Sequence, residues 1–213
     1  MDSNFFLDEL ISRYPPLEPV KEQISKAASA LIQSYESGGK LLLCGNGGSC
    51  SDSDHIVGEL MKGFENKRQI SEAFKNRLTE SAGERGAYLA EKLQQGLPAI
   101  SLTAHTALIT AVSNDTDADL IFAQQVTGYG KAGDVIMGIS SSGNSQNVID
   151  ALITAKAKDM IVIGLTGETG GRMKEYCDIL INVPGRRTAF VQELHLPVYH
   201  VLCLMVEHHF FGK

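Results

Sequence analysis

Residues 41–59 constrain the possible folds of this chain more than any other stretch. The apolar run 41–44 is typical of a buried strand, and it ends in a glycine-rich turn at 45–48, after which a helix begins. Unpaired backbone N–H groups and the helix dipole make such a turn a binding site for an anion. His55 and Glu59 stand four residues apart and therefore share one face of that helix.

Strand and helix patterns alternate along the rest of the 213 residues. Strands are expected at 40–44, 99–102, 134–139, 160–165 and 178–183. Helices are expected at 4–14, 19–35, 48–63, 105–112, 120–129, from 146 to about 158, 170–176 and 188–210. This order predicts an α/β fold, a doubly wound, flavodoxin-like parallel sheet of five strands with helices on both faces. Ligands of such sheets bind beyond the carboxyl ends of the strands.

Residues 64–97 interrupt the alternation, because they are rich in charge and lack a strand pattern. Two thin apolar stripes run through them, first Ile70, Phe74 and Leu78 and then Leu89, Leu93 and Leu97. Residues 81–83 separate the two stripes. We therefore expect a single domain, 1–213, that carries a helical pair at 1–37 and a charged helical insertion at 64–97.

Composition excludes several classes of protein. A net charge of −6 and the lack of any basic run argue against nucleic acid as a partner. The sequence shows no signal-peptide pattern and no apolar stretch of membrane-spanning length, so we predict a cytoplasmic protein without a membrane partner. The cysteines Cys44, Cys50, Cys177 and Cys203 lack zinc-ribbon spacing and indicate a reducing compartment.

A second turn, 140–145, has the same form as the first, with four serines, a glycine and an asparagine between a strand and a helix. Serine hydroxyls donate to phosphate oxygens, and glycines let backbone N–H groups approach closely. The alternative is that these residues are only helix caps. Two such turns in one parallel sheet favour a phosphate site. Neither turn is a P-loop, and the first also lacks the final glycine of the dinucleotide fingerprint, so no nucleotide cofactor is expected.

Several motifs along the chain form a recognisable set. They are 44–49 (CGNGGS), His55-x-x-x-Glu59, 113–115 (SND), 138–145 (GISSSGNS), 165–167 (LTG) with 170–171 (GG), and Gln192-Glu193-x-His195 followed by His200. By these motifs the chain resembles the sugar-isomerase (SIS) domain family, and within it the phosphoheptose isomerases. The resemblance covers nearly all of the sequence except 64–97.

The resemblance implies a reaction, a site and an assembly. The reaction is the isomerisation of sedoheptulose 7-phosphate to D-glycero-D-manno-heptose 7-phosphate, and the assembly is a homotetramer with sites at subunit borders. Glu59 and His200 correspond to the acid–base pair. Positions that bind the sugar phosphate correspond to Asn46, Gly47, Gly48, Ser49, Glu59, Asn114, Asp115, Ser140, Ser141, Ser142, Ser145 and Gln192. A zinc site of some members corresponds to His55, Glu59, Gln192 and His200.

The residue types suit that chemistry. Interconverting a ketose and an aldose requires a proton to leave one carbon and return on its neighbour, and a carboxylate with an imidazole can do this through an enediol. We assign Glu59 as the base and His200 as the acid. The alternatives are that Glu59 is an exposed helix carboxylate and that His200 is a core histidine on an apolar helix. The turn before Glu59 and the presence of Gln192 favour the catalytic roles.

Zinc is a less direct expectation. His55 and Glu59 can chelate a metal as an i, i+4 pair. Gln192 and His200 would lie about 12 Å apart along a continuous helix at 1.5 Å per residue. They reach one ion only if the helix breaks or if different subunits supply them. Pro197 lies between them and is expected to disturb the helix.

Some residues depart from the family pattern and leave other functions open. Ala189 stands where members often have Asp, and residues 186–189 resemble a subgroup that binds a replication initiator protein. The members compared lack the Glu and the last His, both of which are present here. The alternatives are a non-catalytic sugar-phosphate sensor or scaffold and an isomerase of another phosphosugar. The insertion at 64–97 follows the helix of Glu59, so we expect it to reshape the sugar end of the pocket.

Overall fold

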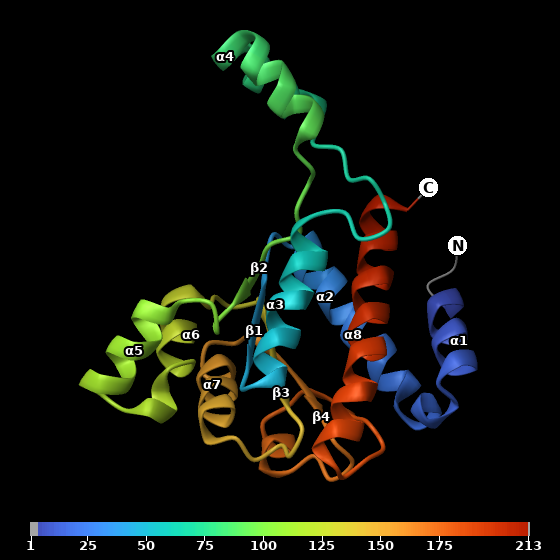
Figure 1. Ribbon diagram of the computed structural model, residues 1–213, viewed down its shortest axis with the longest axis vertical. Helices are drawn as coiled ribbons and strands as arrows, with labels where there is room; N and C mark the ends of the chain where they lie inside the picture. Colours follow the sequence, from blue (N-terminus) through green and yellow to red (C-terminus); the bar gives the residue numbers. More distant parts are fainter. Residues whose placement is uncertain (1–3, 213) are drawn as a thin grey trace.

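A five-stranded parallel sheet lies at the centre of the computed structural model, which describes residues 4–212 (Figure 1). The strands are β1 (Leu41–Gly45), β2 (Ala99–Ser101), β3 (Val135–Ser140), β4 (Ile161–Thr166) and β5 (Ile179–Asn182). Their order is β2-β1-β3-β4-β5, so β1 pairs with β2 on one side and with β3 on the other. This confirms the predicted α/β class, with its switch point between β1 and β3.

Helices cover both faces of the sheet. One face carries α2 (Lys21–Glu36), α3 (Gly48–Met61) and α8 (Thr188–Phe211), and α1 (Asn4–Arg13) with the 3-10 helix η1 (Pro15–Val20) packs outside them. The opposite face carries α6 (Ala123–Tyr129) and α7 (Gln146–Lys156). The remaining elements are α5 (Thr106–Asp115) and the 3-10 helices η2 (Ala118–Leu120) and η3 (Arg172–Glu175). Every residue of β1 and β3 is buried, as a strand covered on both sides requires.

The charged segment forms a helical hairpin, α4 (Glu72–Lys92). Ala82 and Gly83 leave the helical conformation, and Gly83 takes a φ of 53°, so the chain reverses there. The two halves touch closely, since a Cβ at Gly86 would lie 1.9 Å from the carbonyl oxygen of Leu78. Figure 1 shows the hairpin projecting away from the sheet at the top of the molecule. The expected break at 81–83 is therefore present. Phe74 and Leu78 of the first stripe lie on the first arm of the hairpin, and Leu89 of the second stripe lies on the second arm. The other stripe residues, Ile70, Leu93 and Leu97, lie in the segments that join the hairpin to the rest of the protein.

Helix α8 is continuous from Thr188 to Phe211, although Pro197 lies inside it. The expectation that Pro197 disturbs this helix is wrong: the helix packs along its length against α1, α2 and α3, and this packing outweighs one missing N–H donor. Among residues 4–212, only α8 has the length and apolar composition of a membrane-spanning helix. More than half of it is buried inside the protein, which is the environment of a core helix.

Candidate active site

The turn after β1 lies at the carboxyl end of the sheet and opens into α3. Gly47 has a φ of 56°, a conformation that a residue with a side chain rarely adopts. Gly48 begins α3 beside the end of the Gln192 side chain, because a Cβ there would lie 2.5 Å from Gln192 Nε2. Ser49 is buried in the first turn of the helix. The structure thus brings Gly47, Gly48, Ser49 and Gln192 together around one helix N-terminus.

The turn after β3 lies beside the first turn, since β1 and β3 are paired. Ser140 Oγ and Ser145 Oγ are 3.1 Å apart. Asn46 of the first turn exchanges two hydrogen bonds of 2.8 and 3.0 Å with Asn147 at the start of α7. Two helix N-termini, one from each face of the sheet, and their serines therefore meet at its carboxyl end, which suits a doubly charged phosphate.

His55, Glu59 and His200 form a second cluster, where α3 packs against α8. His55 Nε2 lies 3.2 Å from Glu59 Oε1, and the His55 and His200 rings are 5.1 Å apart between centroids. The Phe64 ring lies 5.4 Å from that of His200. Lys62 Nζ approaches the other oxygen of Glu59 at 3.5 Å. The two residues predicted to transfer protons are therefore neighbours in the fold.

Two residues that the sequence did not single out hold the ring of His55. Its Nδ1 lies 3.0 Å from the hydroxyl of Tyr199, which donates a hydrogen bond of 3.3 Å to Asp52 Oδ1. The ring is therefore held on both sides, with Nδ1 against Tyr199 and Nε2 facing Glu59. Asp52 precedes His55 by three residues on α3, a spacing that could have indicated it.

His200 is prepared to act as a neutral imidazole. Its pKa is lowered first by burial and then by the neighbouring His55, and these effects outweigh the attraction of Glu59. Its Nε2 is buried and has no hydrogen-bond partner among the described residues. His200 also lines a groove of about 970 Å³ between α1, residues 64–67 and α8. A buried imidazole nitrogen without a partner calls for a functional explanation.

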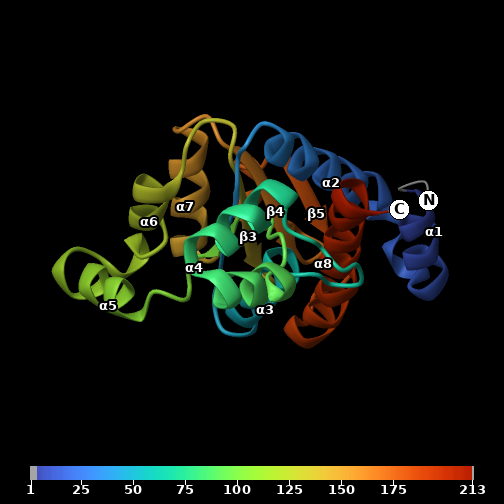
Figure 2. The same cartoon turned by 90° about the horizontal axis from the view of Figure 1, so that it is seen from above.

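The two clusters occupy different ends of α3 within one chain. Glu59 follows Gly48 by eleven positions, about 16 Å along the helix at 1.5 Å per residue. Asn114 and Asp115 end α5, where they are exposed and hydrogen-bonded to each other at 2.8 Å. Figures 1 and 2 both show α5 at the edge of the molecule opposite α8. The structure therefore does not bring Asn114 or Asp115 to the other predicted site residues of the same chain.

The zinc residues are divided in the same way. Gln192 lies at the start of α3, whereas His200 lies beside His55, because α8 runs unbroken between them. Within residues 4–212, no group of three or more His, Cys, Asp or Glu side chains is arranged to hold a metal ion. One chain by itself therefore does not present the predicted four-residue site.

Comparison with protein families gives an independent indication. A family model described as SIS domain matches residues 9–85 and 76–167. The two matched pieces overlap at residues 76–85, inside α4.

Curated relatives and solved structures agree with that match. The chain is 40% identical to the phosphoheptose isomerase of Burkholderia pseudomallei over 89% of its own length and 83% of the relative's. It is 39% identical to phosphoheptose isomerase 2 of Campylobacter jejuni, over 91% of this chain and 89% of the other. The structure of a phosphoheptose isomerase from Neisseria gonorrhoeae superposes with a TM-score of 0.73 at 35% identity, covering 94% of each chain. One from Francisella tularensis gives a TM-score of 0.73 at 31% identity, covering 96% of each.

Proposed function

Because the chain belongs to the SIS domain family and aligns with phosphoheptose isomerases over most of its length, we propose that it interconverts sedoheptulose 7-phosphate and D-glycero-D-manno-heptose 7-phosphate. The observation that carries the mechanism is that His55 contacts both Glu59 and His200 at the junction of α3 and α8. A carboxylate beside two imidazoles supplies the base and the acid that an aldose–ketose isomerisation requires.

The phosphate end of the sugar binds at the two turns. Ser140 and Ser145 supply hydroxyl donors, and the N-termini of α3 and α7 supply backbone N–H groups and positive dipole ends. Gln192 lies against Gly48 at the same place and provides an amide for a sugar hydroxyl. These contacts hold the substrate equally in the ketose and aldose forms, so they contribute to binding more than to the chemical step.

Proton transfer occurs at the carbonyl end. The Glu59 carboxylate removes a proton from C1 of the ketose, and the electron pair forms a C1–C2 double bond as the C2 oxygen takes up a proton from a neutral acid. His200, neutral because its pKa is lowered, gives the C2 oxygen that proton and takes another from the C1 hydroxyl. The enediol then takes the first proton back from Glu59 at C2, which leaves an aldehyde at C1.

A second copy of the chain completes this site in our proposal. The phosphate turns and the proton-transfer residues of one chain lie at opposite ends of α3, about 16 Å apart along the helix from Gly48 to Glu59. The exposed apolar side chains Phe5, Phe190 and Leu196, on α1 and α8, offer a surface for such a contact. We propose a homotetramer in which neighbouring chains contribute phosphate turns and proton-transfer residues to one site. In this tetramer, Asn114 and Asp115 of one chain contribute to the site of a neighbouring chain.

Two further parts of the proposal concern metal and compartment. Since no three His, Cys, Asp or Glu side chains of the described residues are arranged around one ion, a zinc ion in our proposal takes a donor from another chain beside His55, Glu59 or His200, and no step above depends on it. Metal analysis of the purified oligomer measures whether zinc is bound. All four cysteines are free, which suits a reducing cytoplasm.

The decisive experiment is an isomerisation assay in deuterated water. Sedoheptulose 7-phosphate and a panel of other phosphorylated ketoses are incubated with the protein, with and without a chelator. We expect turnover of the heptulose with deuterium incorporated next to the carbonyl. Binding without turnover of any sugar would instead support the sensor alternative, and preference for a shorter ketose would change the substrate.

A further inference from the structure

We propose that the buried ion pair between Arg68 and Glu207 is a positioning device that fixes Glu59 and His200 relative to each other. The two residues come from the segment after α3 and from α8, and they are 1% and 0% exposed. The roles of Glu59 and His200 in this inference rest on the proposed function. Arg68 and Glu207 do not touch the reacting atoms, so they act through the helices that they join.

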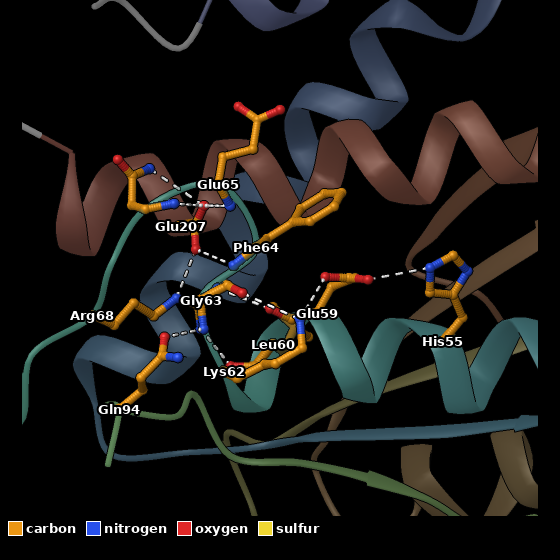
Figure 3. A network of polar contacts seen from close by, with 11 residues as sticks. His55, Glu59, Leu60, Lys62, Gly63, Phe64, Glu65, Arg68, Gln94 and Glu207 are labelled. Atoms are coloured by element: carbon orange, nitrogen blue, oxygen red, sulfur yellow. Dashed lines mark hydrogen bonds and ion pairs between the residues drawn. The ribbon is translucent and has the colours of Figure 1, made fainter. Parts of the chain in front are cut away.

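Arg68 caps the carboxyl end of α3. Its guanidinium donates to the carbonyl oxygens of Glu59 at 2.9 Å and Leu60 at 2.5 Å. The last carbonyls of a helix have no partner within the helix, and a positive charge there also complements the dipole. The cap therefore fixes the backbone of the turn that carries the Glu59 side chain (Figure 3).

Glu207 binds the chain that leaves α3. Its carboxylate lies 2.8 Å from Arg68 Nε and accepts from the backbone N–H groups of Phe64, Glu65 and Asn66 at 2.7, 2.8 and 3.1 Å. Three consecutive amides around one anion form a nest. Burial acts to raise the pKa of Glu207, but the backbone N–H groups and Arg68 together hold it below its ordinary value. The carboxylate is thus charged. Figure 3 shows its contacts with Arg68 and with the backbone of Phe64 and Glu65.

The same carboxylate connects this loop to His200. Glu207 lies seven residues after His200, two turns further along α8. Glu207 accepts a hydrogen bond from the backbone N–H of Phe64, and the Phe64 ring lies 5.4 Å from the His200 ring between centroids. The ion pair therefore restrains two parts of the site. Arg68 restrains the last turn of α3, and Glu207 restrains Phe64, whose ring packs against His200.

Stability alone does not account for such a pair. Replacing a buried ion pair with apolar residues of similar volume is often neutral or stabilising, whereas removing one partner is costly. The pair instead makes directional contacts, from Arg68 to the last carbonyls of α3 and from Glu207 of α8 to the amides of residues 64–66, and an apolar contact would not define such directions. Proton transfer is sensitive to such geometry, since a displacement of about 1 Å can reduce a rate about 100-fold.

The test replaces both partners at once, as Arg68→Met with Glu207→Leu. We expect kcat to fall about 10- to 100-fold while KM stays within about threefold, because the phosphate turns lie at the other end of α3. We also expect the NMR signals of the His200 ring protons to shift, because the Phe64 ring moves. The Arg68→Lys variant, which keeps the charge but not the fork of donors, should show a smaller loss of the same kind.

A second ion pair provides the matched control. Asp134 is buried, pairs with Lys40, and accepts from the backbone N–H groups of Lys40 and Lys131 at the amino ends of the strands. Lys40→Met with Asp134→Leu removes an equivalent network away from both clusters. We expect this variant to change thermal stability by a similar amount while kcat and the His200 signals remain as in the parent protein.

The outcomes separate this inference from the proposed function. An unchanged kcat and unchanged His200 signals in the Arg68→Met/Glu207→Leu protein would overturn the positioning role. A parent protein without isomerase activity would refute the proposed function, while the His200 signals would still decide whether the pair positions that ring. If the double variant does not fold, Glu207→Gln and Arg68→Lys take its place, and the same comparison of kcat, KM and His200 signals applies.

Discussion

Nδ1 of His55 lies 3.0 Å from the hydroxyl oxygen of Tyr199. This contact joins α3 to α8 at the middle of the candidate site, and it leaves the other ring nitrogen of His55 facing Glu59 at 3.2 Å. The tautomer and the orientation of a functional histidine are commonly set by such a bond on its second nitrogen. The site therefore depends on a residue that takes no part in the proposed chemistry.

Removing that hydroxyl should weaken catalysis without preventing folding. In Tyr199→Phe, His55 loses the hydroxyl that contacts its Nδ1, so the His55–Glu59 pair becomes less well oriented. We expect kcat to fall about tenfold, with KM nearly unchanged. Steady-state kinetics measure this, with Tyr176→Phe, on the opposite face of the sheet, as the control. Equal kinetics in the two variants would argue against an orienting role.

Glu59→Gln should remove the proposed base. An amide keeps the shape of the side chain but cannot take a proton from carbon, so we expect turnover and solvent-deuterium exchange to fall about 1,000-fold or more. Thermal unfolding should show that the fold is retained. Glu22→Gln, an exposed carboxylate of α2, is the matched change. Exchange at the parent rate in Glu59→Gln would show that another group is the base.

Ser145→Ala tests the phosphate turn. The substitution removes the hydroxyl that lies 3.1 Å from Ser140 Oγ, and with it one donor to the phosphate. We expect KM to rise about 10-fold and kcat to change less, because the contact is made before and during the reaction alike. Ser29→Ala, on the exposed side of α2, serves for comparison. A drop in kcat at constant KM would place Ser145 at the carbonyl end.

The stability of the protein should depend on pH through His195. This residue is fully buried, and burial lowers its pKa to about 4. Below pH 6.5, His195 binds a proton in the unfolded chain but stays neutral in the folded chain. The free energy of unfolding therefore decreases as pH falls from about 6.5 to about 4. At pH 5 we expect a loss of about 2 kcal/mol relative to pH 8 from this group.

His195→Leu isolates that contribution. Leucine has a similar volume and does not titrate, so the variant should lose about 2 kcal/mol less than the parent between pH 8 and pH 5. Urea unfolding of both proteins at the two pH values gives the comparison. Parallel losses in the two proteins would mean that His195 is protonated in the native state.

The hairpin α4 should be dispensable for folding. It packs mainly on itself and projects from the body, so replacing residues 72–92 by a short glycine-rich linker removes little of the core. We expect the thermal midpoint to change by only a few degrees, with kcat retained. Gel filtration of the shortened protein then shows whether the hairpin contributes to assembly. Loss of the folded state would show that α4 stabilises the sheet.

Local pattern was sufficient for the elements of this fold. All five strands and the main helices begin and end near their predicted positions, because apolar runs, glycine turns and helical periodicity are properties of neighbouring residues. The turn at Ala82 and Gly83 was also visible in this way. Local pattern was wrong at Pro197, since the residues that keep α8 continuous are far away in the sequence.

The sequence by itself determined the sheet, the two serine- and glycine-rich turns and the helix face shared by His55 and Glu59. Only the tertiary structure decided that His200 joins this face while Gln192 lies a helix length away beside Gly48. It also decided that Arg68 and Glu207 are buried against each other. A charged residue has no local signature of burial, because its environment is made by partners more than a hundred residues away.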